Sequence, residues 1–197
     1  QGWVPVPVDE DPLVRMPGTQ PGQTALGAPN RCLNCHAGYD TAVEPGFNWK
    51  GSMMAQSARD FLYWACLTVA GQDSIWAVGT PNATDICERC HFPKGWLEGR
   101  SDPTNATLMT GADFDGVQCD FCHKLVKPWA VGDNPYPNDP DYTAGTFDAD
   151  QAYLASLTDI PPQSGNGSYV ADNANAKRGP YVDAAARHQM LYSPFHR

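Results

Sequence analysis

The sequence has no long hydrophobic run and few basic residues. No run of about 18 apolar residues occurs anywhere in it, and a helix that crosses a membrane needs about that length. Lysine and arginine total 13 against 22 aspartates and glutamates, which gives a formal net charge of −9. Nucleic-acid binding needs a basic surface that such a chain lacks. Composition therefore argues against membrane-spanning and nucleic-acid-binding proteins.

Regular secondary structure is also limited by composition. Glycine and proline number 18 each among the 197 residues, and both disfavour the interiors of helices and strands. We therefore expect mostly coil with short α-helices and little or no β-sheet. Length predicts one domain, which we place at residues 32–197. Residues 1–31 are expected to form an extended Pro-rich arm that docks on its own domain or on a neighbouring subunit.

One five-residue pattern, C-x-x-C-H, occurs three times. The first motif is Cys32–His36, the second is Cys87–His91 and the third is Cys119–His123. Together they use six of the seven cysteines and three of the five histidines. Two thiols three positions apart lie on one side of a helical turn, so both can reach the same porphyrin. C-x-x-C-H is the attachment pattern of c-type haem, with the histidine as an iron ligand.

A single copy of this pattern could equally be a redox dithiol or half of a zinc site. A four-cysteine zinc site does not need a histidine directly after each second cysteine. A thioredoxin-like motif belongs next to a β-α-β pattern, and none is visible. The sequence therefore predicts three covalent haem c groups packed among the short helices. The attachment residues are Cys32, Cys35, Cys87, Cys90, Cys119 and Cys122, and the proximal ligands are His36, His91 and His123.

The second axial ligands of the irons are harder to predict. The two remaining histidines, His188 and His196, lie near an expected helix between Pro180 and Pro194, and both are candidate distal ligands. Three haem irons have six axial positions, and the five histidines of the chain leave one of them without a histidine. Met54 is a candidate for it, since methionine can ligate haem iron. A histidine from another chain or an open position are the alternatives, and an open position would favour an enzyme.

The strongest helical pattern covers residues 52–70. Ser52 is a suitable N-cap, and Gly71 is expected to end the helix. An apolar face is predicted from residues spaced three and four apart, which are Met54, Ala58, Phe61, Leu62, Ala65 and Val69. Cys66 is interpreted as a small buried apolar residue, with pairing between chains as the alternative. A shorter helix is expected at residues 148–157.

The loop at residues 128–146 carries three clustered acids. Asp133, Asp139 and Asp141 supply carboxylates of the kind that calcium prefers. No EF-hand pattern is present, so a calcium site is only a weak prediction.

Phrases around the motifs resemble those of bacterial multihaem c-type cytochromes. They are Trp49–Ala55, Ala58–Asp60, Cys87–Arg100, Asp115–Val117, Arg178–Pro180 and Ser193–His196. In such cytochromes the last phrase runs on into another C-x-x-C-H, whereas this chain stops at Arg197. The haem count of the natural protein therefore stays open, as does whether His196 serves a haem outside this chain. The resemblance implies electron transfer outside the cytoplasm.

These observations lead to two functional hypotheses. Haem attachment to C-x-x-C-H occurs outside the cytoplasm and the chain begins at Gln1. We therefore expect a periplasmic or extracellular protein whose signal peptide has been removed. The first hypothesis is an electron carrier or conduit that meets other redox proteins or cytochromes, with self-association into a filament as a special case. The alternative is a redox enzyme with one open haem that acts on a small oxyanion or nitrogen compound. Nothing in the sequence marks a substrate pocket, so electron transfer is the prediction.

Overall fold

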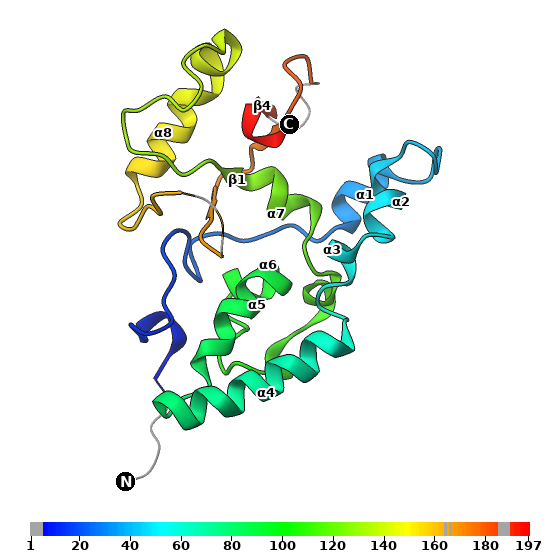
Figure 1. Ribbon diagram of the computed structural model, residues 1–197. Coiled ribbons are helices and arrows are strands. Elements are labelled where there is room, and N and C mark those ends of the chain that lie inside the picture. Colours follow the sequence, from blue (N-terminus) through cyan, green and yellow to red (C-terminus); the bar gives the residue numbers. More distant parts are fainter. Residues whose placement is uncertain (1–5, 164, 166, 185–189) are drawn as a thin grey trace. The chain divides into compact units, whose positions relative to one another are not determined.

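The computed structural model describes residues 6–163, 165, 167–184 and 190–197 (Figure 1). The chain divides into two compact units. The first comprises the residues up to Met16 together with Ala25–Asp120, and the second comprises Pro17–Thr24 and Phe121–Arg197. Helix and coil predominate and the sheets are small, as the composition predicts.

The first unit is built from short helices and one longer helix. In chain order these are η1 (Val8–Glu10), α1 (Asn30–His36), α2 (Pro45–Lys50), α3 (Met53–Gln56), α4 (Phe61–Val78), η2 (Asn82–Thr84), α5 (Asp85–His91), α6 (Pro93–Leu97), η3 (Ala106–Leu108) and η4 (Gly111–Asp115). The boundary between the units falls within α7 (Cys119–Lys124).

The second unit combines helical segments with two small sheets. Its remaining elements are β1 (Leu125–Val126), η5 (Tyr142–Thr146), α8 (Phe147–Ala155), β2 (Val170–Ala171), β3 (Lys177–Gly179), β4 (Met190–Tyr192) and η7 (Pro194–His196). The helix predicted at residues 148–157 corresponds to α8.

In the described part of the Pro-rich arm, from residue 6 onward, the one helical turn before α1 is η1. This part of the arm docks on its own chain. In the first unit, the Asn82 amide donates to the Val6 carbonyl at 2.9 Å and to the Asp11 carboxylate at 3.0 Å. In the second unit, the Thr24 hydroxyl donates to the Ala171 carbonyl at 2.9 Å.

The helix expected over residues 52–70 is interrupted in the structure. Ser52 caps α3 as predicted, by accepting a hydrogen bond from a backbone N–H of the first turn. The chain then leaves the helix, and the Asp60 carboxylate caps α4 in the same way. Helix α4 continues through Gly71, the expected end, and stops at Gly79, whose φ of 85° suits glycine.

The apolar face predicted for this helix is largely exposed on α4. Phe61 is 90% exposed, whereas Tyr63 and Leu67 are buried. Cys66 was expected to be buried and is exposed as well. Asp73 is the single charged residue of the helix, so α4 is apolar on all sides and the spacing of apolar residues could not indicate which side packs. Across the described part of the chain, no helix is long and apolar enough to cross a membrane.

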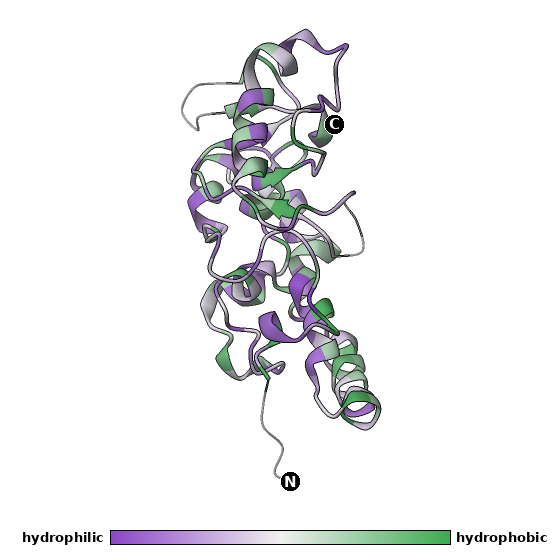
Figure 2. Cartoon of the chain, turned by 90° about the vertical axis from the view of Figure 1, so that its left-hand side faces the viewer, coloured by the Kyte–Doolittle hydropathy of each residue, from purple (hydrophilic) through white to green (hydrophobic). Residues whose placement is uncertain are grey.

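The second unit has a small apolar core around β1 and β2. These antiparallel strands place Val126 opposite Val170, and Tyr153 and Leu154 of α8 pack against them. Both strands consist of apolar residues, which Figure 2 colours green. The Tyr153 hydroxyl donates to the Ala171 carbonyl at 2.6 Å, so α8 is held to β2 by a hydrogen bond as well as by packing.

The helix expected between Pro180 and Pro194 is contradicted where the structure describes this stretch. Strand β3 pairs in parallel with β4, with Arg178 opposite Leu191, and the Ser193 amide donates to the Gly179 carbonyl at 2.8 Å. Pro194 opens η7 rather than closing a helix. Strand β4 depends on pairing with another strand, which proline spacing cannot reveal.

We predict that replacing Gly116 by alanine destabilises the first unit. Gly116 has a φ of 63°, and a Cβ there would collide with the Met54 carbonyl and the Ser57 hydroxyl. Overpacking of this kind costs about 1–3 kcal/mol. Gly111→Ala is the matched control, because Gly111 also has a positive φ but a Cβ added there would meet nothing within 4 Å. Denaturant unfolding followed by circular dichroism should show the larger loss for Gly116→Ala, and equal losses would contradict the prediction.

Candidate functional site

Each C-x-x-C-H motif lies on a short helix. Helix α1 carries the first motif, α5 the second and α7 the third. The two cysteines of a motif are therefore one turn apart. All seven cysteines lie in the described part of the chain, none forms a disulfide, and none of the six in the motifs is fully buried. Each of these six cysteines is therefore at least partly exposed.

The histidine of the second motif is held from two sides. Its Nδ1 lies 3.1 Å from the Ser57 carbonyl oxygen, and the Ser57 hydroxyl donates to the His91 carbonyl at 2.8 Å. The Tyr63 ring stacks on the imidazole with ring centres 3.8 Å apart and 5° between the planes. With Nδ1–H donating to Ser57, the lone pair of His91 is on Nε2. This is the arrangement in which a histidine binds a metal through Nε2.

The histidine of the third motif is held in the same way. Nδ1 of His123 lies 2.7 Å from the carbonyl oxygen of Arg178, 55 positions away in the sequence. Its Nε2 is therefore also the nitrogen left with a lone pair. A backbone carbonyl from a distant segment fixes the imidazole in both motifs.

His196 lies beside the third motif. Its ring is nearly parallel to that of His123, with 6° between the planes and 6.4 Å between the ring centres. Its Nε2 lies 2.8 Å from the Cys122 carbonyl oxygen. Burial lowers the pKa of His196, and the nearby His123 also lowers it. The imidazole is therefore neutral near pH 7, the form that binds metals.

The first motif ends at an exposed histidine, His36. Here α2 approaches α1 closely at Gly46. A Cβ at Gly46 would lie 2.7 Å from the side chains of Ala37 and Leu33 and 2.8 Å from the His36 carbonyl oxygen. Glycine is therefore needed for α2 to pack beside the first motif.

Among the described residues, no hydrogen bond or ring contact brings Met54 to a motif histidine. Met54 lies on α3 and is half-exposed, and its backbone carbonyl accepts a hydrogen bond from the Val117 amide at 2.9 Å. His188 lies outside the described residues.

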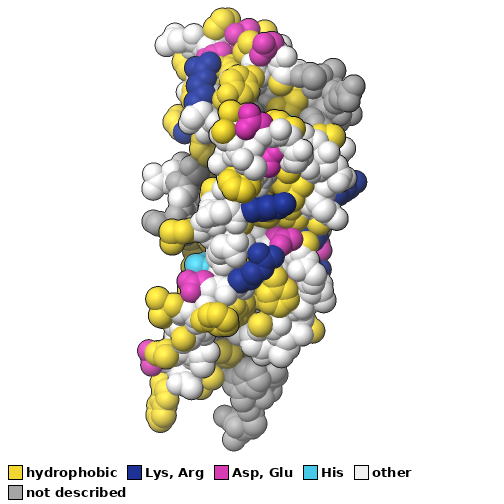
Figure 3. Space-filling model, turned by 90° about the vertical axis from the view of Figure 1, so that its right-hand side faces the viewer, with side chains coloured by type: hydrophobic (Ala, Val, Ile, Leu, Met, Phe, Trp, Pro, Cys, Tyr) yellow, Lys and Arg dark blue, Asp and Glu magenta, His cyan; other side chains and the backbone are white. Residues whose placement is uncertain are grey.

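Large apolar side chains are exposed in the first unit. Met53, Phe61 and Trp76 are each about 90% exposed, although side chains of this size gain most from burial. Figure 3 shows hydrophobic side chains spread over one face of the molecule. These side chains are available to contact another apolar group.

Buried carboxyl groups surround the second motif. Glu88, inside the motif, is fully buried, and this burial raises its pKa to about 9, with a further contribution from the charge of Asp85. Neither carboxyl oxygen of Glu88 has a hydrogen-bond partner within the described part of the chain. With a pKa of about 9, Glu88 carries a proton at neutral pH.

Burial also raises the pKa of Asp85 to about 6, although hydrogen bonds from Trp96 at 2.8 Å and Ser101 at 2.9 Å lower it.

The predicted calcium loop does not gather its acids. The Asp139 carboxylate accepts hydrogen bonds from the Tyr192 hydroxyl at 2.7 Å and from the Tyr142 amide at 3.1 Å. Among the described residues, no group of three or more His, Cys, Asp or Glu side chains could hold a metal ion. Calcium binding stays a prediction.

The sequence did not reveal the groups that hold the motif histidines. Every residue has a backbone carbonyl, so Ser57 and Arg178 gave no signal for this role. Tyr63 lies within the predicted helix, but nothing in its spacing pointed to His91. Tertiary packing brings these groups to the histidines.

No protein-family model, curated protein or solved structure matches the chain. Its function has to be inferred from its own residues.

We predict that Glu88→Gln removes a pH dependence of stability. The folded-state pKa of Glu88, about 9, lies above the ordinary value of 4.5. The stabilisation by its proton is therefore complete below pH 4.5 and is lost as pH rises through 9. Between these values the wild-type free energy of unfolding should fall with rising pH, and Glu88→Gln should flatten this fall.

Glu98→Gln serves as the control. Hydrogen bonds from Lys94 and Arg100 lower the pKa of Glu98 against the opposing effect of its partial burial, so its contribution is lost toward acidic pH instead. Urea unfolding measured from pH 5 to 9 separates the two variants. A slope in Glu88→Gln equal to that of the wild type would show that Glu88 is already ionised in the folded state.

Proposed function

We propose that this chain is an electron-transfer protein of the periplasm or cell exterior that holds three covalent haem c groups on its C-x-x-C-H motifs. Cys32 and Cys35, Cys87 and Cys90, and Cys119 and Cys122 form the thioethers. His36, His91 and His123 are the proximal iron ligands. A bound haem supplies one-electron chemistry at its iron, and the protein tunes it through ligands and surroundings.

The pairing of His123 with His196 is the observation that carries this proposal. A metal–imidazole bond is about 2 Å long and a bonded nitrogen lies about 1 Å from its ring centre, so two opposed ligands have ring centres about 6 Å apart. The separation of 6.4 Å fits this value. His196 would exchange its contact with the Cys122 carbonyl for the metal. We therefore assign His196 as the distal ligand of the third site.

The hydrogen bonds that fix the imidazoles of the motif histidines support the same proposal. His91 and His123 each have Nδ1 at a backbone carbonyl, and metal-binding histidines typically donate their second ring N–H in this way. The partly exposed cysteines and the uncovered apolar side chains also suit a large apolar group attached to short helices.

If His123 and His196 both held the third haem, that site would have no open position for a substrate, and this would favour electron transfer over catalysis there. The sixth ligands of the first and second sites are proposed from His188, Met54 or a neighbouring chain. Other redox proteins or cytochromes, and further copies of this chain, are the proposed partners.

Mass spectrometry of the exported, matured protein should find three covalently added haems, because each motif offers two partly exposed cysteines. Cys119→Ala/Cys122→Ala should carry one haem fewer and retain the other two. An apo mass for the matured wild-type chain would refute the proposal.

His196→Ala should convert one iron of the oxidised protein from low spin to high spin, because the third site loses its distal ligand. The measurement is electron paramagnetic resonance integrated per haem, with and without cyanide. Phe195→Leu is the control, since it changes the neighbouring residue and keeps the imidazole. An unchanged spectrum for His196→Ala would remove His196 from the ligand set, and a high-spin iron in the wild type that binds cyanide would favour an enzyme.

A further inference from the structure

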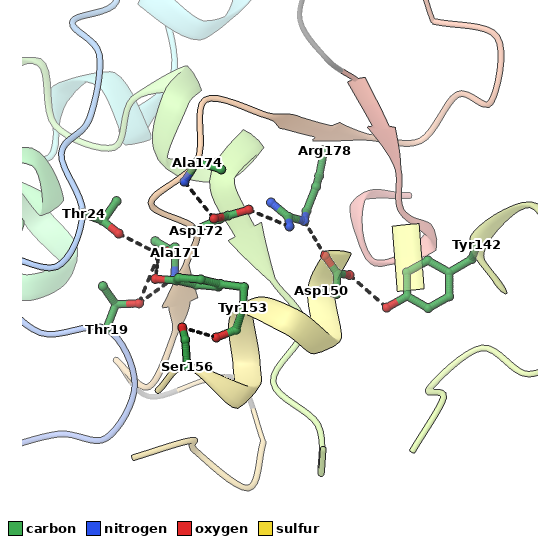
Figure 4. A network of polar contacts seen from close by, with 10 residues as sticks. All are labelled: Thr19, Thr24, Tyr142, Asp150, Tyr153, Ser156, Ala171, Asp172, Ala174 and Arg178. Atoms are coloured by element: carbon green, nitrogen blue, oxygen red, sulfur yellow. Dashed lines mark hydrogen bonds and ion pairs between the residues drawn. The ribbon is translucent and has the colours of Figure 1, made fainter. Parts of the chain in front are cut away.

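A buried ionic cluster in the second unit is not explained by the proposed function. Arg178 is fully buried. Its Nε donates to Asp150 at 2.7 Å and its Nη2 donates to Asp172 at 2.8 Å (Figure 4). The second oxygen of Asp150 accepts a hydrogen bond from the Tyr142 hydroxyl at 2.9 Å. Burying such charges costs about as much as their attraction returns, so stability alone does not account for the cluster.

The same arginine also holds the histidine of the third motif. Its carbonyl oxygen is the group 2.7 Å from Nδ1 of His123. Arg178 lies in the middle of β3, whose partner β4 leads directly into η7 and His196. One residue thus contacts the proximal histidine and anchors the strand pair that leads to the distal one.

We propose that Arg178 is the positioning residue of the third haem site. Asp150 and Asp172 clamp its guanidinium, and the clamped residue keeps its carbonyl oxygen on Nδ1 of His123. This inference rests on the proposed function, because it takes His123 as an iron ligand. The bond to the carbonyl makes the imidazole a stronger donor, which favours the oxidised iron and lowers the reduction potential of this haem.

The test uses two variants that keep the charge of the cluster. Arg178→Lys retains the positive charge but loses the planar fork that reaches both carboxylates. Tyr142→Phe removes the hydrogen bond to Asp150 and is milder, so it remains informative if Arg178→Lys does not fold. Both are made in the haem-loaded full chain and studied by redox titration and electron paramagnetic resonance. The third haem is identified as the signal missing from Cys119→Ala/Cys122→Ala.

In both variants we expect the third haem to shift to a higher reduction potential and to new low-spin g values, while the other two haems stay unchanged. Arg100→Lys is the matched control. Arg100 makes an equivalent paired contact with Asp113 in the first unit, at 2.6 Å through both Nε and Nη2, and its replacement should leave the third haem unchanged.

Two outcomes would overturn the proposal. One is a folded Arg178→Lys or Tyr142→Phe protein whose third haem keeps its wild-type potential and g values, because Arg178 would then serve stability alone. The other is an equal shift of all three haems. Failure of the proposed function is seen separately, because mass spectrometry would then find no covalent haem on the wild-type chain.

Discussion

A histidine ring can bind a metal through only one nitrogen at a time, and something must hold its other nitrogen. In this chain backbone carbonyls do so. Ser57 holds Nδ1 of His91, and Arg178 holds Nδ1 of His123. Both carbonyls come from segments distant in the sequence, so the surrounding fold must keep them in place. The break between α3 and α4 brings Ser57 to its position, and the pairing of β3 with β4 does the same for Arg178.

The two carbonyls are secured by different physical means. Ser57 adds a hydroxyl that donates to the His91 backbone, so the second motif and the α3–α4 junction hold each other. Arg178 relies on its own buried side chain and on two carboxylates. This ionic clamp adds to the pairing of β3 with β4, because a strand only three residues long makes few ladder hydrogen bonds of its own.

The sequence predicted the local structure of the motifs better than the tertiary contacts around them. The spacing within each motif predicted helical turns, and the prolines and glycines predicted a fold of coil and short helices. His196 was predicted as a distal ligand because few histidines were left, and that role stays a prediction. The buried side of α4 could not be predicted, because apolar residues such as Phe61 occur on all sides of the helix. The strand at Met190–Tyr192 depends on pairing with Lys177–Gly179, which no local pattern encodes.

The exposed apolar residues follow from the same organisation. Among the described residues, one core cluster of the first unit comprises Ala58, Phe92 and Met109. Met53, Phe61 and Trp76 remain outside it and are each about 90% exposed. Under the proposed function, cofactors bound to adjacent helices supply the missing apolar contacts. The short helices would then serve mainly to position cysteine and histidine. Residues distant in the sequence hold the histidine side chains in place.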